Sequence, residues 1–169
     1  MGGELSRTVE IQISNDTQNF TLENPRTYFY NGHCSVPPSP SLPPGSEDSC
    51  KFSSPLFKGC VGVLSYEAES FTLAIYFCNP LDYNLHSMVL GLELSLQKVH
   101  LNSLEDTYTR MVTGSYAPNM VIVSDRVALD TSQKPARVSA GPVKAMATMS
   151  NDRNAIIRLV LEGWESSGE

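Results

Sequence analysis

The strongest structural signal in the chain is a pair of β-rich runs joined by four residues of turn-like character. Residues 59–66 and 71–77 are rich in aliphatic and aromatic side chains, and residues 67–70 read Glu-Ala-Glu-Ser. A connection of that length and polarity is typical of a β-hairpin. We therefore predict two adjacent, central strands. The glycines in the first run indicate that another backbone or a bulky ring approaches closely there.

The same strand signal recurs along the chain. Residues 8–13 alternate polar and apolar side chains, and we expect further strands at 27–30, 89–96, 120–123, 143–149 and 155–161. One short helix is expected from Asn102 to about Val112, because Ser103 can cap its first turn. Many strands with one or two short flanking helices predict a mainly β protein built as a β-sandwich.

Length and charge limit the number of domains and the classes of partner. A chain of 169 residues with 41% hydrophobic content can bury one good core, so we expect a single domain. We place a short arm at 1–7, the sandwich domain at 8–162 and a tail at 163–169. The net charge of -6 gives no attraction to phosphate backbones, so nucleic acid is not an expected partner.

The first residues and the cysteines bear on localisation. No basic region followed by a long apolar run is present, so we expect a soluble, cytoplasmic or non-classically secreted protein that can still meet a target membrane. Cys34, Cys50, Cys60 and Cys78 are too far apart for paired zinc knuckles, and free thiols are expected. A bridge between Cys34 and Cys50, across the proline-rich loop at 36–46, stays an alternative in an oxidising compartment. That loop is expected to be exposed, because its prolines cannot donate to a sheet.

Motifs for catalysis are absent from the sequence. His33, His86 and His100 lie far apart, and neither a nucleophile elbow nor a zinc-binding helix is present. We expect exposed, structural roles for His33 and His100, and helix capping for Glu105 and Asp106. The chain is therefore not expected to be an enzyme, and no cofactor or metal is predicted.

One segment resembles a known family. Residues 72–84, TLAIYFCNPLDYN, closely resemble the pattern TLAVLFSVPYDYN of the actinoporins, which are pore-forming cytolysins of sea anemones with relatives in fish. Further matches lie at 24–29, 61–66, 147–149 and 155–157, so the resemblance covers about residues 8–161 and is greatest to the fish actinoporin-like proteins. It implies an actinoporin-like β-sandwich flanked by helices.

The resemblance also implies a ligand. Actinoporins usually target sphingomyelin, whose phosphocholine headgroup is held in a mostly aromatic pocket because ring faces attract a quaternary ammonium. Carried over by position, three headgroup-binding residues agree with the family, and three stand where the family has other types. The first set is Val61, Pro80 and Tyr108; the second is Asn31, Cys78 and His86. Leu104 and Thr109 replace two further tyrosines, so a cage poor in rings is expected.

The loop that follows residue 79 is the expected membrane-facing surface. Tyr83, Leu85 and Val89 are assigned to it, with Leu85 and Val89 standing where the family usually has tryptophan. The alternative is purely structural: Tyr83 and Asn84 close a tight turn while Leu81 and Leu85 pack on the core. Tyr108 likewise suits either core packing or lipid contact.

The expected function combines these features. Residues 1–7 have neither the length nor the apolar face of the family's membrane-inserting helix, so we expect binding to a phosphocholine or sphingomyelin-like headgroup with weak or no lysis. Homo-oligomers on membranes are what the family would form. The alternative function is a non-lytic, lectin-like module for a carbohydrate or headgroup, since fungal lectins share the sandwich.

Overall fold

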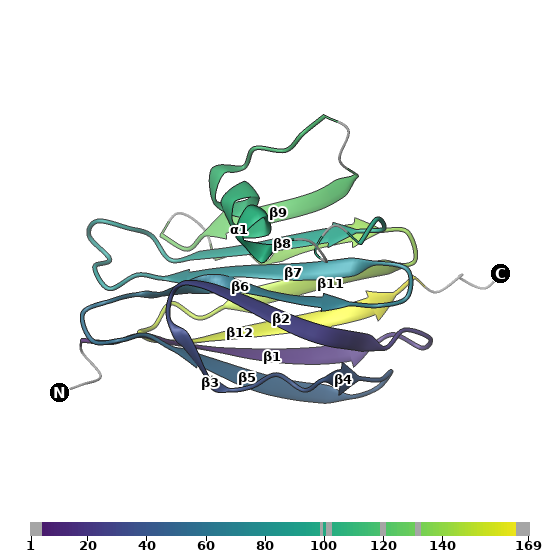
Figure 1. Ribbon diagram of the computed structural model, residues 1–169, viewed down its shortest axis with the longest axis horizontal. Coiled ribbons are helices and arrows are strands. Elements are labelled where there is room, and N and C mark those ends of the chain that lie inside the picture. The colour runs from purple at the N-terminus through teal and green to yellow at the C-terminus, as the bar shows by residue number, and fades with distance from the viewer. Residues whose placement is uncertain (1–4, 99, 101–102, 119–120, 131–132, 165–169) are drawn as a thin grey trace.

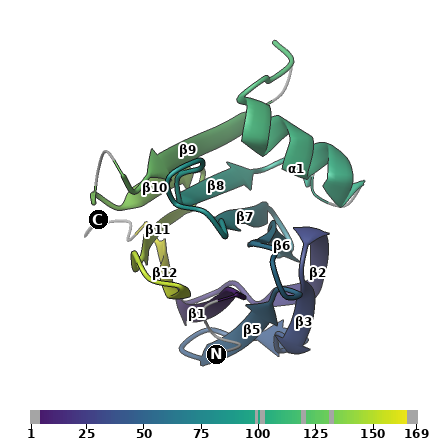
Figure 2. The same cartoon turned by 90° about the vertical axis from the view of Figure 1, so that its left-hand side faces the viewer.

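The computed structural model describes residues 5–98, 100, 103–118, 121–130 and 133–164. These residues form two six-stranded sheets that face each other, with one α-helix outside the second sheet (Figures 1 and 2). The prediction of a mainly β sandwich is confirmed. The predicted arm at 1–7 is described only from residue 5, and most of the predicted tail lies outside the described residues.

The first sheet brings the two ends of the domain together. In spatial order it consists of β10 (Ala136–Ala140), β11 (Val143–Met149), β12 (Asn154–Gly163), β1 (Thr8–Asp16), β5 (Glu47–Ser53) and β3 (His33–Val36). Strands β1 and β12 are parallel, and the other neighbours are antiparallel. The expected hairpin at 143–161 is therefore present as β11 and β12.

The second sheet contains the predicted central hairpin. Its order is β4 (Ser41–Leu42), β2 (Leu22–Asn31), β6 (Cys60–Glu67), β7 (Thr72–Asn79), β8 (Val89–Ser95) and β9 (Ile122–Ala128), with all neighbours antiparallel. The proline-rich segment contributes β4, and Leu42 is 2% exposed. The expectation that this whole segment is an exposed loop is therefore wrong at Leu42, which packs into the core.

Alternating side chains place the core between the sheets. Val9, Ile11 and Ile13 of β1 are buried, while the residues between them are partly exposed on the outer face. Strands β6, β7 and β8 differ, because nearly all of their residues are buried on both faces. Their inward side chains join the main core, and their outward side chains join a second apolar cluster with Met111.

Helix α1 (Leu104–Thr113) covers that outer face. Ser103 caps it by accepting a hydrogen bond from the Asp106 amide, as the sequence predicts. Gly114 ends it in the left-handed conformation, where its N–H bonds the carbonyl of Arg110. Leu104, Thr107 and Met111 form its buried face.

Gly62 shows why the central hairpin contains glycine. A Cβ atom at this position would lie 2.4 Å from the carbonyl oxygen of Tyr28 and 3.1 Å from the ring of Phe77. Any side chain would push β2 away from β6. The close backbone approach expected from the sequence is therefore present at this residue.

Candidate functional site

A groove lies on the outer face of the second sheet, beside α1. It has a volume of about 640 Å³, and its walls come from β2, β6, β7, β8, β9, α1 and the connections at 57–59 and 80–87. Helix α1 is shorter than the strands it lies against (Figure 1), and its Tyr108 forms part of the wall of the groove. One end of the sandwich thus combines a concave surface with two connecting loops.

All six residues carried over as headgroup-binding line this single groove. They come from five elements and from separate parts of the sequence: Asn31, Val61, Cys78, Pro80, His86 and Tyr108. Cys78 is partly exposed, and its thiol donates a weak hydrogen bond to the carbonyl of Ser87 at 3.8 Å. Their role in binding stays a prediction, but the fold brings them together.

Tyrosine rings gather around Tyr108. Tyr30 stacks on it with centroids 5.8 Å apart and an interplanar angle of 9°, and Tyr76 meets it edge-on at 5.8 Å. Tyr28 lies 5.4 Å from the same ring. Tyr30, Tyr76 and Tyr108 all line the groove. The carried-over positions supply only Tyr108 as a ring, and strands β2 and β7 add Tyr30 and Tyr76 to the groove.

The phenols of Tyr76 and Tyr108 are neutral around physiological pH. Burial, with smaller contributions from neighbouring Cys78 and Tyr30, raises the pKa of Tyr108 to about 12. Burial also raises the pKa of Tyr76. The ring faces therefore keep the electron-rich quadrupole that attracts cations.

Cationic side chains line the same groove. Lys58 and Arg126 are among its residues, and one Arg126 N–H donates to the carbonyl of Val112 at 2.9 Å, which ties β9 to α1. The lining of the groove therefore combines two cationic side chains and the carboxylate of Asp82 with the tyrosine rings.

The 80–87 connection is an ordered turn. The side chain of Asp82 accepts a hydrogen bond from the Asn84 amide, and its carbonyl accepts from the amides of Leu85 and His86. Asn79 donates from its side chain to the carbonyls of Thr8, Asp152 and Arg153. The Asp-Tyr-Asn sequence thus closes a tight turn, as the structural alternative proposes.

The three residues assigned to the membrane-facing surface differ in position. Leu85 is 73% exposed at the tip of the turn, whereas the structural alternative packs it on the core. Tyr83 is 44% exposed, and its hydroxyl donates to the side-chain oxygen of Asn79 at 2.9 Å. Val89 is only 6% exposed, because it points outward from β8 into the cluster beneath α1. A membrane-facing Val89 is therefore not supported; the residue lies at the base of the groove.

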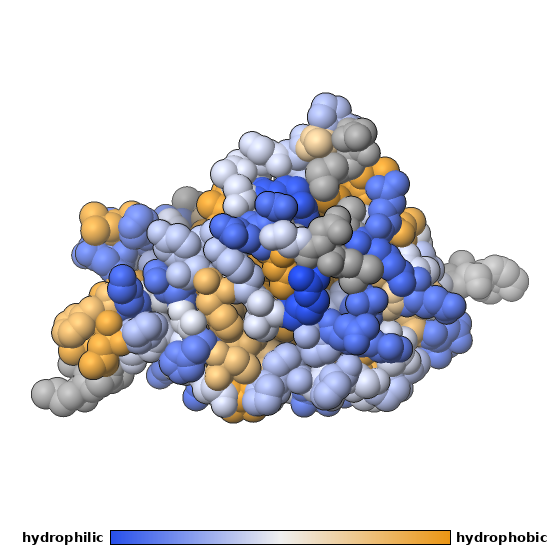
Figure 3. Space-filling view, in the orientation of Figure 1, coloured by the Kyte–Doolittle hydropathy of each residue, from blue (hydrophilic) through white to orange (hydrophobic). Residues whose placement is uncertain are grey.

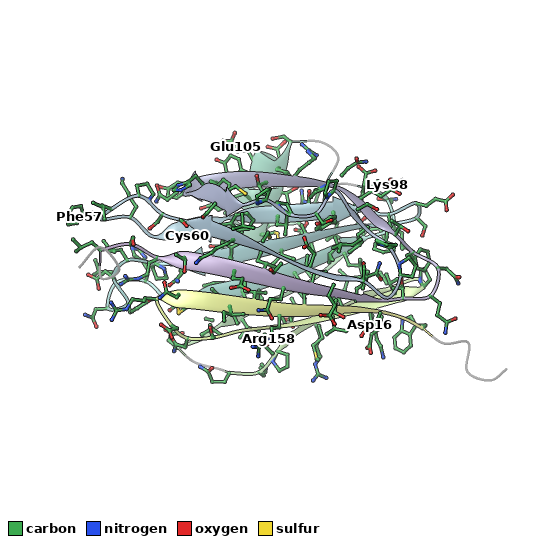
Figure 4. All side chains as sticks on the ribbon, turned by 90° about the horizontal axis from the view of Figure 1, so that it is seen from below. Asp16, Phe57, Cys60, Lys98, Glu105 and Arg158 are labelled. Carbon is green, nitrogen blue, oxygen red and sulfur yellow. The ribbon has the colours of Figure 1, made fainter. Side chains whose placement is uncertain are left out.

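A second apolar tip lies at the same end of the molecule. Leu56 and Phe57 of the β5–β6 connection are 57% and 63% exposed, and Phe57 has a positive φ of 67°. Figure 4 shows Phe57 at the extreme end of the molecule, and Figure 3 shows apolar surface gathered at that end. Sequence reasoning missed this pair, although a Leu-Phe-Lys stretch just before a strand is its signal.

Arg7 ties the two connections together. Its guanidinium donates to the carbonyls of Pro80 and Leu81 at 3.1 and 2.7 Å and lies 5.0 Å from the ring centre of Tyr83. Its backbone amide donates to the hydroxyl of Ser54 at 2.8 Å. A buried residue of the predicted arm therefore positions Pro80 at the edge of the groove.

A buried carboxylate holds α1 on the sheet. Glu93 of β8 is fully buried and accepts hydrogen bonds from His100, Arg110 and Tyr116 at 2.7–3.0 Å. Burial by itself raises the pKa of Glu93, but these hydrogen bonds outweigh it and keep the pKa below its ordinary value of 4.5. This network fixes the helix that carries Tyr108.

The histidines have different surroundings. His33 and His86 are exposed, while His100 is 1% exposed and bonded to Glu93. The expectation of an exposed His100 is therefore wrong, because Glu93 provides a buried partner.

Within the described residues, no group of three potential ligands could hold a metal ion, and no helix there is long and apolar enough to cross a membrane.

Sequence comparison supports the resemblance inferred from residues 72–84. DELTA-actitoxin-Aas1a of Anthopleura asiatica is 36% identical over 90 residues, which is 50% of this chain and 41% of that protein. Cytolysin tenebrosin-B of Actinia tenebrosa is 34% identical over 89 residues, which is 50% of this chain and 41% of that protein. Nigrelysin of Anthopleura nigrescens is 30% identical over 113 residues, 63% of this chain and 52% of that protein. This chain resembles the sea-anemone actinoporins. The matches span about half the length of these relatives, and no family model matches the chain.

Structure comparison supports the actinoporin-like sandwich. The lipid binding protein Nakanori superposes with a TM-score of 0.69 and 16% identity, over 92% of this chain and 70% of that chain. The Xerocomus chrysenteron lectin XCL superposes with a TM-score of 0.56 and 8% identity, over 92% of this chain and 99% of that chain. At these identities the likeness shows the fold alone.

Proposed function

We propose that the groove binds the phosphocholine headgroup of membrane lipids such as sphingomyelin, and that the loops beside it rest in the membrane interface. The observation that carries the proposal is the cluster of Tyr30, Tyr76 and Tyr108 within the groove. A quaternary ammonium cannot donate a conventional hydrogen bond, so neutral ring faces are its natural partners.

The phosphate of the same headgroup needs positive charge. Lys58 and Arg126 line the groove that contains the tyrosines. A groove that holds tyrosine rings, two cations and the single carboxylate of Asp82 is complementary to a zwitterion, whose positive end would meet the rings and whose negative end would meet the cations. A headgroup with a primary amine would bind less well, because transferring its ammonium from water to the rings costs more.

The apolar tips supply contact with the bilayer. Leu56, Phe57 and Leu85 are exposed at the end of the molecule where the groove opens, and Phe57 and Leu85 also line it. Such side chains gain free energy when they enter the apolar side of the interface, and tyrosine suits the headgroup level. The groove and the tips would then meet one membrane together.

The names of similar proteins agree with this proposal. The sequence relatives include a cytolysin, and one of the superposed folds is that of a lipid binding protein. A binding protein of this kind has no need of a catalytic group, in line with the sequence-based expectation that the chain is not an enzyme.

Vesicle flotation tests the proposal. Vesicles of phosphatidylcholine with sphingomyelin are compared with vesicles of phosphatidylethanolamine and phosphatidylglycerol, and free phosphocholine is added as competitor. We expect flotation with the choline lipids and its loss in the presence of the competitor. Tyr108→Ala should weaken binding about tenfold, because it removes the central ring of the cluster.

Glu105→Gln is the matched control, since Glu105 is exposed on the same helix and does not line the groove. Equal flotation of wild type and Tyr108→Ala, or equal binding to vesicles without choline, would disprove the headgroup assignment. Dye release from the same vesicles separates binding from permeabilisation, and the expectation from sequence is weak or no release.

A further inference from the structure

A second hollow lies at the other end of the sandwich, on the outer face of the first sheet. It has a volume of about 380 Å³ and is lined by strands β9 to β12 and by the residue that follows β12, Trp164. This is the one tryptophan of the chain, and 55% of it is exposed. Met146 and Val123 lie in the same hollow and are 39% and 38% exposed.

Charged groups surround the indole. The ammonium of Lys144 lies 4.6 Å from the ring centre and 3.8 Å from a carboxylate oxygen of Glu162. Arg137 lines the hollow as well, and the strand register places it opposite Met146. The amide of Trp164 donates to the carbonyl of Pro142 at 2.9 Å, which holds the backbone of the ring-bearing residue in place.

The composition of the hollow matches the chemistry of a sugar. The C–H faces of a pyranose are apolar and stack on an indole, while its hydroxyl groups exchange hydrogen bonds with charged side chains. Glu162 pairs with Lys144, and the carboxylate of Asp125 bonds the backbone amide of Arg137 at 2.9 Å rather than its guanidinium. The guanidinium of Arg137 is therefore the cation that can meet a ligand that is itself an anion.

We propose that the Trp164 hollow binds an acidic saccharide, such as a sugar carrying a carboxylate. The ring of the sugar stacks on the indole, and its carboxylate pairs with the guanidinium of Arg137. The inference does not rest on the headgroup groove, because β12 runs toward the end of the molecule opposite the 57–59 and 80–87 connections (Figures 1 and 4). A protein docked on a membrane through the groove would keep this hollow exposed.

The tryptophan is a built-in reporter for the test. Because the chain has no other tryptophan, its fluorescence, excited at a wavelength where tyrosine does not absorb, reports on this hollow alone. Glucuronic acid is titrated to about 50 mM, a range suited to weak sugar binding, with glucose and acetate as comparison ligands at constant ionic strength. We expect a saturable change with glucuronic acid, a weaker one with glucose and none with acetate.

Variants locate the binding site. By calorimetry, Trp164→Ala and Arg137→Gln should each reduce affinity for glucuronic acid about tenfold, whereas Lys51→Gln, an exposed cation on β5, should leave it unchanged. The absence of a saturable response to glucuronic acid, or unchanged binding by Trp164→Ala, overturns the proposal. Equal responses to acetate and glucuronic acid reduce the site to an ion contact, and equal responses to glucose overturn the assignment to an acidic sugar. Sphingomyelin flotation should be the same for Trp164→Ala and wild type.

Discussion

The outer faces of the two sheets are built from similar strands but have different surroundings. On the first sheet, β1, β11 and β12 alternate between buried and more exposed residues, and polar side chains such as Gln12 and Arg158 bond each other at the surface. On the second sheet, β6, β7 and β8 are buried almost throughout, because α1 lies over them. The ten-residue helix α1 therefore accounts for the greater burial of the outer face of the second sheet.

The comparison teaches how a polar site arises on a sheet. An uncovered face leaves its charged groups in water, where ion pairs contribute little. A covered face buries the carboxylate of Glu93, and partial cover leaves a groove with tyrosines at the edge of the helix. Polar interactions should therefore be much stronger on the second sheet than on the first.

The largest effect is expected at the buried carboxylate. Glu93→Ala should lower the free energy of unfolding by about 3–5 kcal/mol, because Arg110 and His100 lose their buried partner. Urea denaturation measures the loss. Glu47→Ala, at an exposed position of β5, should change stability by less than about 0.5 kcal/mol. Equal effects of the two variants would remove the distinction between the faces.

Glycines in the two sheets provide the next comparison. Gly62→Ala should cost about 1–3 kcal/mol, because its Cβ would meet the backbone oxygen of Tyr28 at 2.4 Å. Gly163→Ala in β12 is the control, since its nearest contact would be 3.8 Å away. Thermal unfolding of both variants checks this. A Gly62→Ala protein as stable as Gly163→Ala would contradict the close packing of β2 on β6.

Acid should remove the stabilisation that Glu93 gives to the covered face. The folded-state pKa of Glu93 lies below its ordinary value of 4.5, so its contribution is present above that pH and is lost as the pH falls through the folded-state value. The loss is about 1.4 kcal/mol for each unit of pKa difference. Urea midpoints from neutral pH to below 4.5 measure it, and Glu93→Gln should flatten the decline. An unchanged decline in that variant would mean that other carboxylates cause it.

The smallest effect concerns the contact between the arm and the groove. Arg7→Lys should weaken vesicle binding about fivefold, because a single ammonium cannot donate to the carbonyls of Pro80 and Leu81 in the way a planar guanidinium does. Arg158→Lys on the uncovered face should bind like wild type. Equal vesicle binding by both variants would contradict this prediction, because it would show that the position of Pro80 does not depend on Arg7.

Local patterns predicted most of the fold. The alternation at 8–13, the hairpin at 59–77 and the cap at Ser103 depend on neighbours in sequence, and all three are present in the structure. Strands β3, β4, β5 and β10 were missed. The first three flank or lie within the proline-rich segment and are stabilised by pairing with other strands.

The site depends on contacts that no local pattern reports. Glu93 stands in an alternating run that suggests an exposed carboxylate, and only the position of α1 makes it buried. Tyr30 and Tyr76 join Tyr108 through the pairing of strands that are far apart in sequence. The family pattern pointed to six residues that line the groove. It could do so because positions matched to a family of the same fold occupy corresponding places in space.

The parallel pairing of β1 with β12 sets the order in which the chain can complete its structure. Thr8 lies beside Asn154, so one side of the first strand has no partner until almost the whole domain has been synthesised. Pairing at such sequence separation is slow, because a long loop must close, at a cost in chain entropy, before any stabilising contact forms. On the ribosome, the nascent protein should therefore expose the unpaired edge of β1 until β12 has been synthesised. We expect chaperones to bind the nascent chain during that time.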